Sequence, residues 1–389
     1  MKVAILGAGT VGASLAKLLC KNDKITAVIV IDQNGNALTE LETFCQSSKL
    51  RTYRVSIAKQ QSLLTLVKGF DCMISALPHA LNYRLTKFAK EVGINYIDLG
   101  GDDHLLEKQL GLNDREPYND SWIIPNSGLA PGLVNILAMH GYEELDKVDS
   151  IKIWSASLPI EPKPPFNYQL SFSPVGLMRE YVDPVTILND GKIKTVNPLD
   201  GYEKVTFESK PELNELEAFY VSGSITSLVK SLEGKVKDLT HKTLRYSGHR
   251  DIIKALIDLG FGSDQIIDIR TNLTFQELLV RQFQRHLPRG QKDFVIVKLV
   301  IEGQRKGENI RRDYELIHEY DEVNGISAMM AATTIPTIII AELIAEHKLI
   351  GDPRVVPPEQ VVPKEEFLDR LKEKGLDIRM TENVLSLNT

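Results

Sequence analysis

Three glycines and one aspartate near the N-terminus have the types and spacing that bind a dinucleotide. Gly7, Gly9 and Gly12 follow the apolar run 3–6 in the order G-x-G-x-x-G, and Asp32 ends a second apolar run. Between a strand and a helix, such glycines permit a tight turn, close backbone approach to a pyrophosphate and close helix packing. A carboxylate about 20 residues further on accepts hydrogen bonds from ribose hydroxyls. The sequence therefore predicts a dinucleotide site here.

The residues around Asp32 predict NAD rather than NADP. A carboxylate at this position repels a 2′-phosphate. The next residues, Gln33, Asn34 and Gly35, include no arginine that could bind that phosphate. We therefore expect NAD as the cofactor.

The elements that must position these groups alternate between strand and helix. Strands are expected at 3–6, 25–31, 52–57, 71–77, 95–99 and 122–125, with helical patterns between them. This alternation predicts a doubly wound parallel sheet of the Rossmann type. Ligands lie beyond the carboxyl ends of such strands. The remaining candidate cofactor-binding residues follow from that rule: Thr10, Val11, Ser56, Ala76, Leu77, Pro78, Asn82, Asp98 and Gly100. Asn82 could instead be a local cap.

The second half of the chain has longer, alternating segments. Strands are expected at 150–157 and 167–172, and a long hairpin at 294–303 and 312–320. This pattern predicts an α+β domain with a mixed, largely antiparallel sheet, so the whole chain is α/β with a second domain. We expect a Rossmann domain at 1–128, a substrate and dimerisation domain at 129–325, and C-terminal helices at 326–389. Those helices return to the first sheet, or pack wholly on the second domain.

Composition narrows the class of protein. The net charge of −6 argues against nucleic acid and anionic membrane partners. Cys20, Cys45 and Cys72 match no metal or disulfide pattern, so we expect no metal, free thiols and a cytoplasmic location. Met1 and Lys2 lead directly into the first strand, so no signal peptide is expected. The apolar run 335–344 is shorter than a bilayer span.

Several segments resemble a known family. Residues 7–12, 75–77 with Asn82, 96–101 and 128–135 resemble the saccharopine dehydrogenase-like oxidoreductases. Within that family, residues 216–219, 242–249 and 357–363 are most similar to the lysine 6-dehydrogenases. The resemblance implies NAD-dependent oxidative deamination of the ε-amine of L-lysine, to a semialdehyde that closes into a cyclic imine. It also implies a small amino-acid substrate.

This chemistry needs a cation for the α-carboxylate, a polar group for the α-amine and a base for the ε-ammonium. Arg245 is the candidate for the carboxylate, because a guanidinium binds it through two hydrogen bonds. The catalytic candidates are His249, Lys242 and Asp102, and the other substrate-binding candidates are Tyr246, Phe172, Tyr168 and Glu217. Each has a structural alternative: Asp102 as a helix cap, His249 at a helix start, Lys242 in solvent, and the aromatic residues in the core.

Two other functions compete with this one. A saccharopine or carboxynorspermidine dehydrogenase acts on a secondary amine with an extra carboxylate, which would require a second buried cation from Arg270, Arg281 or Arg285. A non-catalytic NAD-binding protein would keep the fingerprint without turnover. An apolar C-terminal helix and an exposed sheet edge favour a homodimer or larger homo-oligomer. The sequence leaves the general base and the direction of the reaction open.

Overall fold

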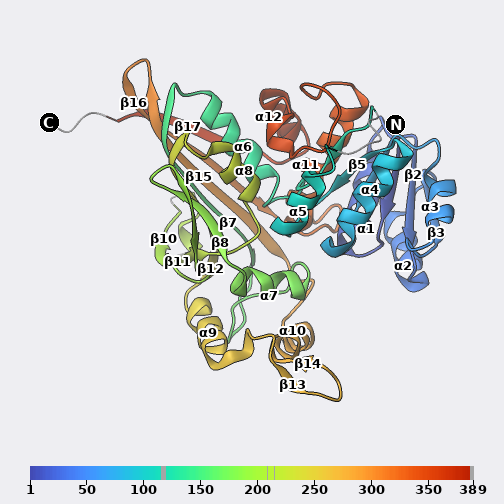
Figure 1. Cartoon of the computed structure of the whole chain (residues 1–389), viewed down its shortest axis with the longest axis horizontal. Helices are drawn as coiled ribbons and strands as arrows, with labels where there is room; N and C mark the ends of the chain where they lie inside the picture. The colour runs from blue at the N-terminus through green and yellow to red at the C-terminus, as the bar shows by residue number, and fades with distance from the viewer. Residues whose placement is uncertain (115–119, 208, 214, 386–389) are drawn as a thin grey trace. The chain divides into compact units, whose positions relative to one another are not determined.

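The computed structural model describes residues 1–114, 120–207, 209–213 and 215–385 (Figure 1). The chain divides into two compact units. The first unit contains Met1–His140 and Met330–Leu376, and the second contains Gly141–Met329 and Asp377–Thr389. Of the 326–389 segment assigned from sequence to the C-terminal helices, positions 386–389 lie outside the described residues.

The first unit contains a parallel sheet. Its strands are β1 (Lys2–Leu6), β2 (Ala27–Asp32), β3 (Leu50–Arg54), β4 (Cys72–Ser75), β5 (Asn95–Asp98) and β6 (Ile123–Ile124). The order β3-β2-β1-β4-β5-β6 changes direction at β1, as in a doubly wound fold. The expected Rossmann sheet is confirmed. β3 ends at Arg54, earlier than expected, so Ser56 lies in the loop that follows it.

Helices connect these parallel strands. They are α1 (Thr10–Lys21), α2 (Gly35–Cys45), α3 (Gln60–Val67), η1 (His79–Leu81), α4 (Asn82–Val92) and α5 (Asp103–Leu110). α4 buries Leu85, Phe88 and Ala89 in the cluster that covers one face of the sheet. It ends at Gly93, which adopts the left-handed conformation (φ 73°) predicted for a C-terminal glycine. In Figure 1 the blue and cyan helices flank this sheet.

α6 (Leu133–Glu143) follows β6, and the C-terminal helices are α11 (Ala328–Ala345), η4 (Pro358–Gln360) and α12 (Lys364–Glu373). α6 begins at Leu133, directly after Gly132. In α11, Thr337 Oγ1 donates to the Ser127 carbonyl (2.8 Å), which joins this helix to the loop after β6. α11 has the length and apolar composition of a membrane span, but 89% of it is buried, which is typical of a core helix.

An ion-pair network joins α12 to α11. Arg370 is 7% exposed and its guanidinium lies 2.5 Å from Glu346 and from Glu366, and 3.4 Å from Glu342. Lys374 pairs with the far oxygen of Glu342 at 2.8 Å. Because one buried guanidinium faces carboxylates from both helices, these charges hold the C-terminal segment within the first unit.

The second unit contains a mixed sheet. Its strands are β7 (Lys147–Pro159), β8 (Val185–Asn189), β9 (Lys192–Val196), β10 (Glu203–Val205), β11 (Leu216–Tyr220), β12 (Val236–Tyr246), β15 (Asp293–Arg305), β16 (Glu308–Glu319) and β17 (Arg379–Val384). β12 pairs with β7 in parallel, and the other described pairs are antiparallel. The expected mixed, mostly antiparallel sheet and its long β15–β16 hairpin are confirmed. β17 pairs with β16, whereas we expected this segment with the first domain.

Shorter elements of the second unit cover part of this sheet. They are α7 (Pro174–Val182), η2 (Pro211–Leu213), α8 (Thr226–Leu232), α9 (His249–Leu256), η3 (Ile257–Phe261), β13 (Ile266–Asp268), β14 (Leu273–Thr274) and α10 (Phe275–His286). The strand expected at 167–172 is wrong, because that segment is irregular. Its alternating apolar residues Tyr168 and Leu170 are nevertheless buried, in a cluster with α7 and α10. Packing against helices produced the pattern that we interpreted as strand periodicity.

Candidate functional site

The turn after β1 requires glycine at two positions. Gly7 has φ +104°, and a Cβ there would lie 2.8 Å from the Ala76 carbonyl oxygen at the end of β4. A Cβ on Gly12 would lie 2.0 Å from the Gly7 carbonyl oxygen. Both distances are shorter than any real contact, so the first and third glycines are required by the packing of β1, α1 and β4.

Gly9, the middle glycine of the motif, is not required by packing within the protein. Gly9 is the N-cap of α1 in an extended conformation (φ −70°), and no side chain caps the helix. A Cβ on Gly9 would have no atom within 4 Å. The protein itself therefore tolerates a side chain here, and the space it would fill lies in front of a helix N-terminus. That space fits a pyrophosphate, which binds to the free N–H groups at such an end.

Asp32 lies beside this turn at the end of β2. Its carboxylate accepts hydrogen bonds from the backbone N–H groups of Ala8 (2.7 Å) and Asn34 (2.7 Å). These bonds fix the carboxylate at the carboxyl edge of the sheet, where a ribose would bind. Asp32 therefore lies at the edge of the sheet where its role is expected, and its contact with a ribose stays a prediction.

Sequence reasoning missed a cation close to the same loop. Arg54 is opposite Asp32 in the β2–β3 register, and its Nε donates to the Gln33 carbonyl at 3.3 Å. Its side chain is exposed and passes beside Gly35. An arginine next to the ribose loop is the feature that accommodates a 2′-phosphate. No local motif shows it, because Arg54 comes from the following strand.

Asp98 and Asn82, predicted to bind the cofactor, are buried and hydrogen-bonded inside the unit. Asp98 accepts from the Gly100 N–H (2.9 Å) and from Gln109 Nε2 (2.7 Å), and burial raises the pKa of its carboxyl. Asn82 Oδ1 accepts from the Ser75 hydroxyl at 3.2 Å. These bonds shape the loops after β4 and β5, and direct cofactor contacts of the two residues stay predictions.

Asp102 has the structural role that the sequence left open. Its carboxylate accepts from the Leu105 N–H (2.9 Å) and so caps α5. The other oxygen lies 3.9 Å from His79 Nε2. The remaining candidates of this edge lie in its loops and first helix: Thr10, Val11, Ser56, Ala76, Leu77 and Pro78. Their contacts with a cofactor, and a catalytic role of Asp102, stay predictions.

The second unit holds a buried arginine on β12. Arg245 is 3% exposed. Its Nη1 donates to the Leu244 carbonyl (2.9 Å) and to the Thr243 hydroxyl, and its Cζ lies 4.8 Å from the centre of the Tyr168 ring. Nη2 is 3.4 Å from a Glu180 carboxylate oxygen on α7, and Nε has no hydrogen-bond partner among the described residues. The guanidinium is held on one edge and incompletely paired on the other.

Glu180 is the residue that sequence reasoning missed in this cluster. Its side chain is 26% exposed, and burial raises the pKa of its carboxyl to about 7, against the opposing effect of Arg245. Glu180 lies in the helical sequence of α7, with no motif around it. Only the tertiary structure brings Glu180 of α7 to Arg245 of β12.

His249, the first candidate base, is 2% exposed and has partners on both ring nitrogens. Nδ1 donates to the Phe166 carbonyl (2.8 Å), and Nε2 accepts from the Tyr181 hydroxyl (2.9 Å). Burial, with a smaller effect of Arg245, lowers the pKa of His249 to about 3. The ring is therefore neutral and holds Tyr181 in place. A proton-transfer role would require it to break one of these bonds, and stays a prediction.

The other candidates of this unit are also in structural contacts. Lys242 pairs with Glu203 at 3.0 Å. Glu217 accepts from the backbone N–H groups of Gly248 (3.1 Å) and Arg250 (2.5 Å), which stabilises the start of α9. The Tyr246 hydroxyl donates to the Pro159 carbonyl, and Phe172 packs against the cluster around α7. The structure brings Tyr168 to Arg245. The substrate roles of Tyr168, Tyr246, Phe172 and Glu217, and a catalytic role of Lys242, stay predictions.

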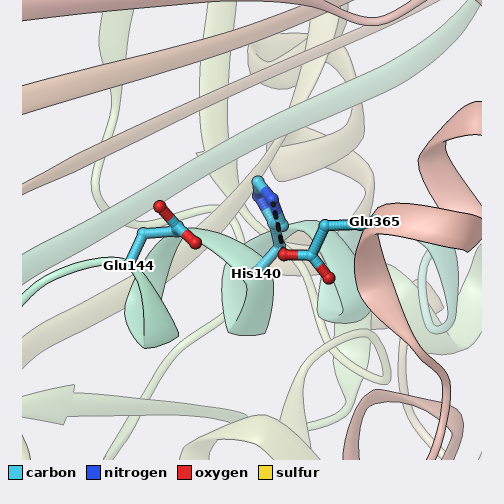
Figure 2. A group of neighbouring side chains, drawn as sticks. All are labelled: His140, Glu144 and Glu365. Atoms are coloured by element: carbon cyan, nitrogen blue, oxygen red, sulfur yellow. Dashed lines mark ion pairs between the residues drawn. The ribbon is translucent and has the colours of Figure 1, made fainter.

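One group of potential metal ligands includes His140 and Glu365 of the first unit. His140 Nε2 lies 3.8 Å from a Glu365 oxygen (Figure 2). Figure 2 also labels Glu144, which follows His140 by one helical turn and belongs to the second unit. Both glutamates are exposed, and such acidic groups are common without an ion. We assign no metal to this group.

A parallel Rossmann sheet whose glycine turn is open in front of Gly9 is typical of NAD(P)-binding proteins. Two family models cover nearly the whole chain: the saccharopine dehydrogenase NADP binding domain matches residues 3–119, and the saccharopine dehydrogenase C-terminal domain matches residues 128–376. The chain belongs to the saccharopine dehydrogenase family. Residues 3–119 match the dinucleotide-binding domain of that family.

Curated relatives are distant and longer. The rat mitochondrial alpha-aminoadipic semialdehyde synthase is 24% identical over 67% of this chain and 28% of its own length. A saccharopine dehydrogenase of Saccharomyces cerevisiae, named as NADP-dependent and L-glutamate-forming, is 21% identical over 69% of this chain and 60% of its own. The chain thus spans less than two thirds of the curated relatives it matches.

Solved structures share the fold. The apo saccharopine dehydrogenase (L-Glu forming) of Saccharomyces cerevisiae has a TM-score of 0.78 at 17% identity, over 98% of this chain and 100% of that one. The homospermidine synthase of Legionella pneumophila, in complex with NAD, has a TM-score of 0.70 at 16% identity, over 99% and 91%. At these identities the likeness supports the architecture alone.

Proposed function

We propose that this protein is an NAD-dependent lysine 6-dehydrogenase, which oxidatively deaminates the ε-amine of L-lysine. The observation that carries the proposal is Arg245. Among the described residues of the second unit, it is the arginine whose side chain is buried, and on its Nε–Nη2 edge Nε has no hydrogen-bond partner while Nη2 lies 3.4 Å from Glu180. A buried guanidinium with a free edge recognises one carboxylate through two hydrogen bonds.

The number of buried cations favours lysine over saccharopine. Saccharopine carries additional carboxylates, and the residues that we considered for them, Arg270, Arg281 and Arg285, are all exposed. Burying an unpaired carboxylate is unfavourable, so a larger polyanionic substrate lacks a matching partner among these arginines. Carboxynorspermidine and saccharopine dehydrogenase activity remain the alternative, because the L-glutamate-forming saccharopine dehydrogenase of Saccharomyces cerevisiae resembles this chain both in sequence and in its solved structure.

The first unit would hold the cofactor through its own groups. The N-terminus of α1 binds the pyrophosphate in the space before Gly9, and Asp32 binds the ribose hydroxyls. When bound, the nicotinamide accepts the hydride from the ε-carbon. Asp32 favours NAD over NADP, because its carboxylate repels a 2′-phosphate. Arg54 would weaken this preference, because its guanidinium can bind a 2′-phosphate.

Location and assembly are part of the proposal. All cysteines of the chain are free, which supports a reducing, cytoplasmic location. Leu259 and Ile269 of the second unit are 75% and 86% exposed, which supports association into a homodimer or larger homo-oligomer.

The experiment is nicotinamide reduction by the purified protein with NAD or NADP and a panel of L-lysine, L-ornithine, L-saccharopine and carboxynorspermidine. We expect turnover with L-lysine and NAD, and little with the other amines. Turnover only with a secondary amine would move the function to the alternative. Tight NAD binding without any turnover would indicate a non-catalytic protein.

A further inference from the structure

One edge of the Arg245 guanidinium is incompletely paired. In arginine, Nε and Nη2 point to the same side and form the edge that binds a carboxylate side-on. In this protein Nε has no hydrogen-bond partner among the described residues, although the arginine is 97% buried. The opposite group, Nη1, is fixed by the Leu244 carbonyl and Thr243. The Nε–Nη2 edge therefore has a fixed direction, but its Nε–H makes no hydrogen bond. A buried donor without a hydrogen bond lowers the stability of the folded protein.

Glu180 is the acidic group nearest to that edge. It contacts only Nη2, at 3.4 Å, which is long for a charge-assisted hydrogen bond of about 2.7–2.9 Å. Its side chain is 26% exposed, whereas that of Arg245 is 4% exposed. Glu180 is thus the more exposed of the two charged groups.

The surrounding residues keep these two groups in place. The Tyr168 ring packs over the guanidinium, and Tyr181 lies next to Glu180 on α7, with its hydroxyl donated to His249. Tyr181 also interacts with Arg245, and burial is the main cause of its raised pKa. Neutral tyrosine and histidine groups therefore line the cation, and the ionisable acid beside it is Glu180.

We propose that Arg245 and Glu180 together bind the head group of an α-amino acid, Arg245 taking the α-carboxylate on its Nε–Nη2 edge and Glu180 taking the α-ammonium. The two groups of the ligand are attached to one carbon, so an acid within 3.4 Å of the carboxylate-binding edge reaches the ammonium. The reacting amine of L-lysine lies at the far end of a four-carbon stem. Glu180 therefore acts in binding and not as the base of the reaction. This inference rests on the proposed function and adds the residue that selects an α-amino acid.

The test separates the two halves of the head group. Binding is measured by calorimetry with L-lysine, with 6-aminohexanoate, which lacks the α-ammonium, and with 1,5-diaminopentane, which lacks the carboxylate. For Glu180→Gln we expect about 10- to 100-fold weaker binding of L-lysine and nearly unchanged binding of 6-aminohexanoate, since one charged hydrogen bond is lost. For Arg245→Lys we expect weaker binding of both carboxylates and nearly unchanged binding of 1,5-diaminopentane.

Controls exclude a merely structural effect. Glu215→Gln neutralises an exposed carboxylate that pairs with Lys204, and we expect it to bind all three ligands as the unmodified protein does. Thermal melting checks folding, and Glu180→Asp, which keeps the charge, provides a second variant if Glu180→Gln unfolds. With saturating L-lysine, kcat of Glu180→Gln should stay within a few-fold while KM rises.

The outcomes distinguish this inference from the proposed function. Equal loss of L-lysine and 6-aminohexanoate in Glu180→Gln, or no loss of either, would overturn the head-group site. Binding of L-lysine without reduction of NAD would keep the site and overturn the dehydrogenase. If L-lysine does not bind, the same variants are measured with L-saccharopine, which carries the same head group. Binding of neither amino acid overturns both proposals.

Discussion

Gly9 and Gly12 belong to the same motif, but we predict that Gly9 is needed for binding the dinucleotide and Gly12 for folding. In Gly9→Ala, the new Cβ has no protein atom within 4 Å and the backbone conformation suits any residue. The loss of stability should therefore be small, about 0.5–1 kcal/mol for replacing an N-cap glycine by alanine. The Cβ fills the space before the helix N-terminus, so the dinucleotide should lose one or two charged hydrogen bonds.

Each such bond contributes about 1.5–3 kcal/mol. We therefore expect the Kd for NADH to rise by about 10- to 100-fold or more in Gly9→Ala. Gly12→Ala behaves differently, because its Cβ would lie 2.0 Å from the Gly7 carbonyl oxygen and the turn must move. Overpacking of this kind destabilises a protein by about 1–3 kcal/mol or more.

Fluorescence titration with NADH and thermal melting of the cofactor-free protein measure the two effects separately. Gly111→Ala, at the end of α5, is the matched control, since its Cβ meets the nearest atom at an ordinary 3.4 Å. The reasoning is refuted if Gly9→Ala binds NADH normally, or if it unfolds as readily as Gly12→Ala. Either result would mean that the open space at Gly9 is not the pyrophosphate site.

Three further predictions follow from the charges. Arg370→Met should lower the free energy of unfolding by about 2–4 kcal/mol in urea, because it removes the ion pairs that one buried guanidinium makes with Glu342, Glu346 and Glu366, while the Lys374–Glu342 pair stays. Hydrogen bonds from Arg370 lower the pKa of the Glu346 carboxyl. The stability that this pair contributes is therefore present above the unfolded pKa of about 4.5 and is lost as pH falls below it. In Arg370→Met, the free energy of unfolding should fall less on acidification. Asp32→Ala should raise the KM for NAD and reduce the preference for NAD over NADP. Adding Arg54→Ala should raise the KM for NADP again. Equal effects of Asp32→Ala on the KM values of both cofactors would contradict the role of Asp32 at the ribose.

The sequence by itself determined the first unit to a large extent. The strand–glycine–helix–strand pattern and Asp32 act through local geometry, because the turn, the helix start and the strand end lie within one βαβ segment. The alternation of apolar runs also predicted the parallel order of the strands, since right-handed crossovers leave few alternatives. The hairpin β15–β16 followed from alternation and its turn residues in the same way.

Tertiary structure decided what the polar residues do. Glu217 holds the start of α9 and His249 binds Tyr181, because each meets a partner far away in the sequence of its unit. Asp102, by contrast, caps α5 through the nearby Leu105 N–H, a local role that the sequence alone offers. Arg54 and Glu180 carry no motif and reach Asp32 and Arg245 only through strand register and helix packing. A residue type shows which chemistry is available, but a hydrogen bond or ion pair needs partners at a few ångströms, and those distances arise only when segments far apart in the sequence pack together.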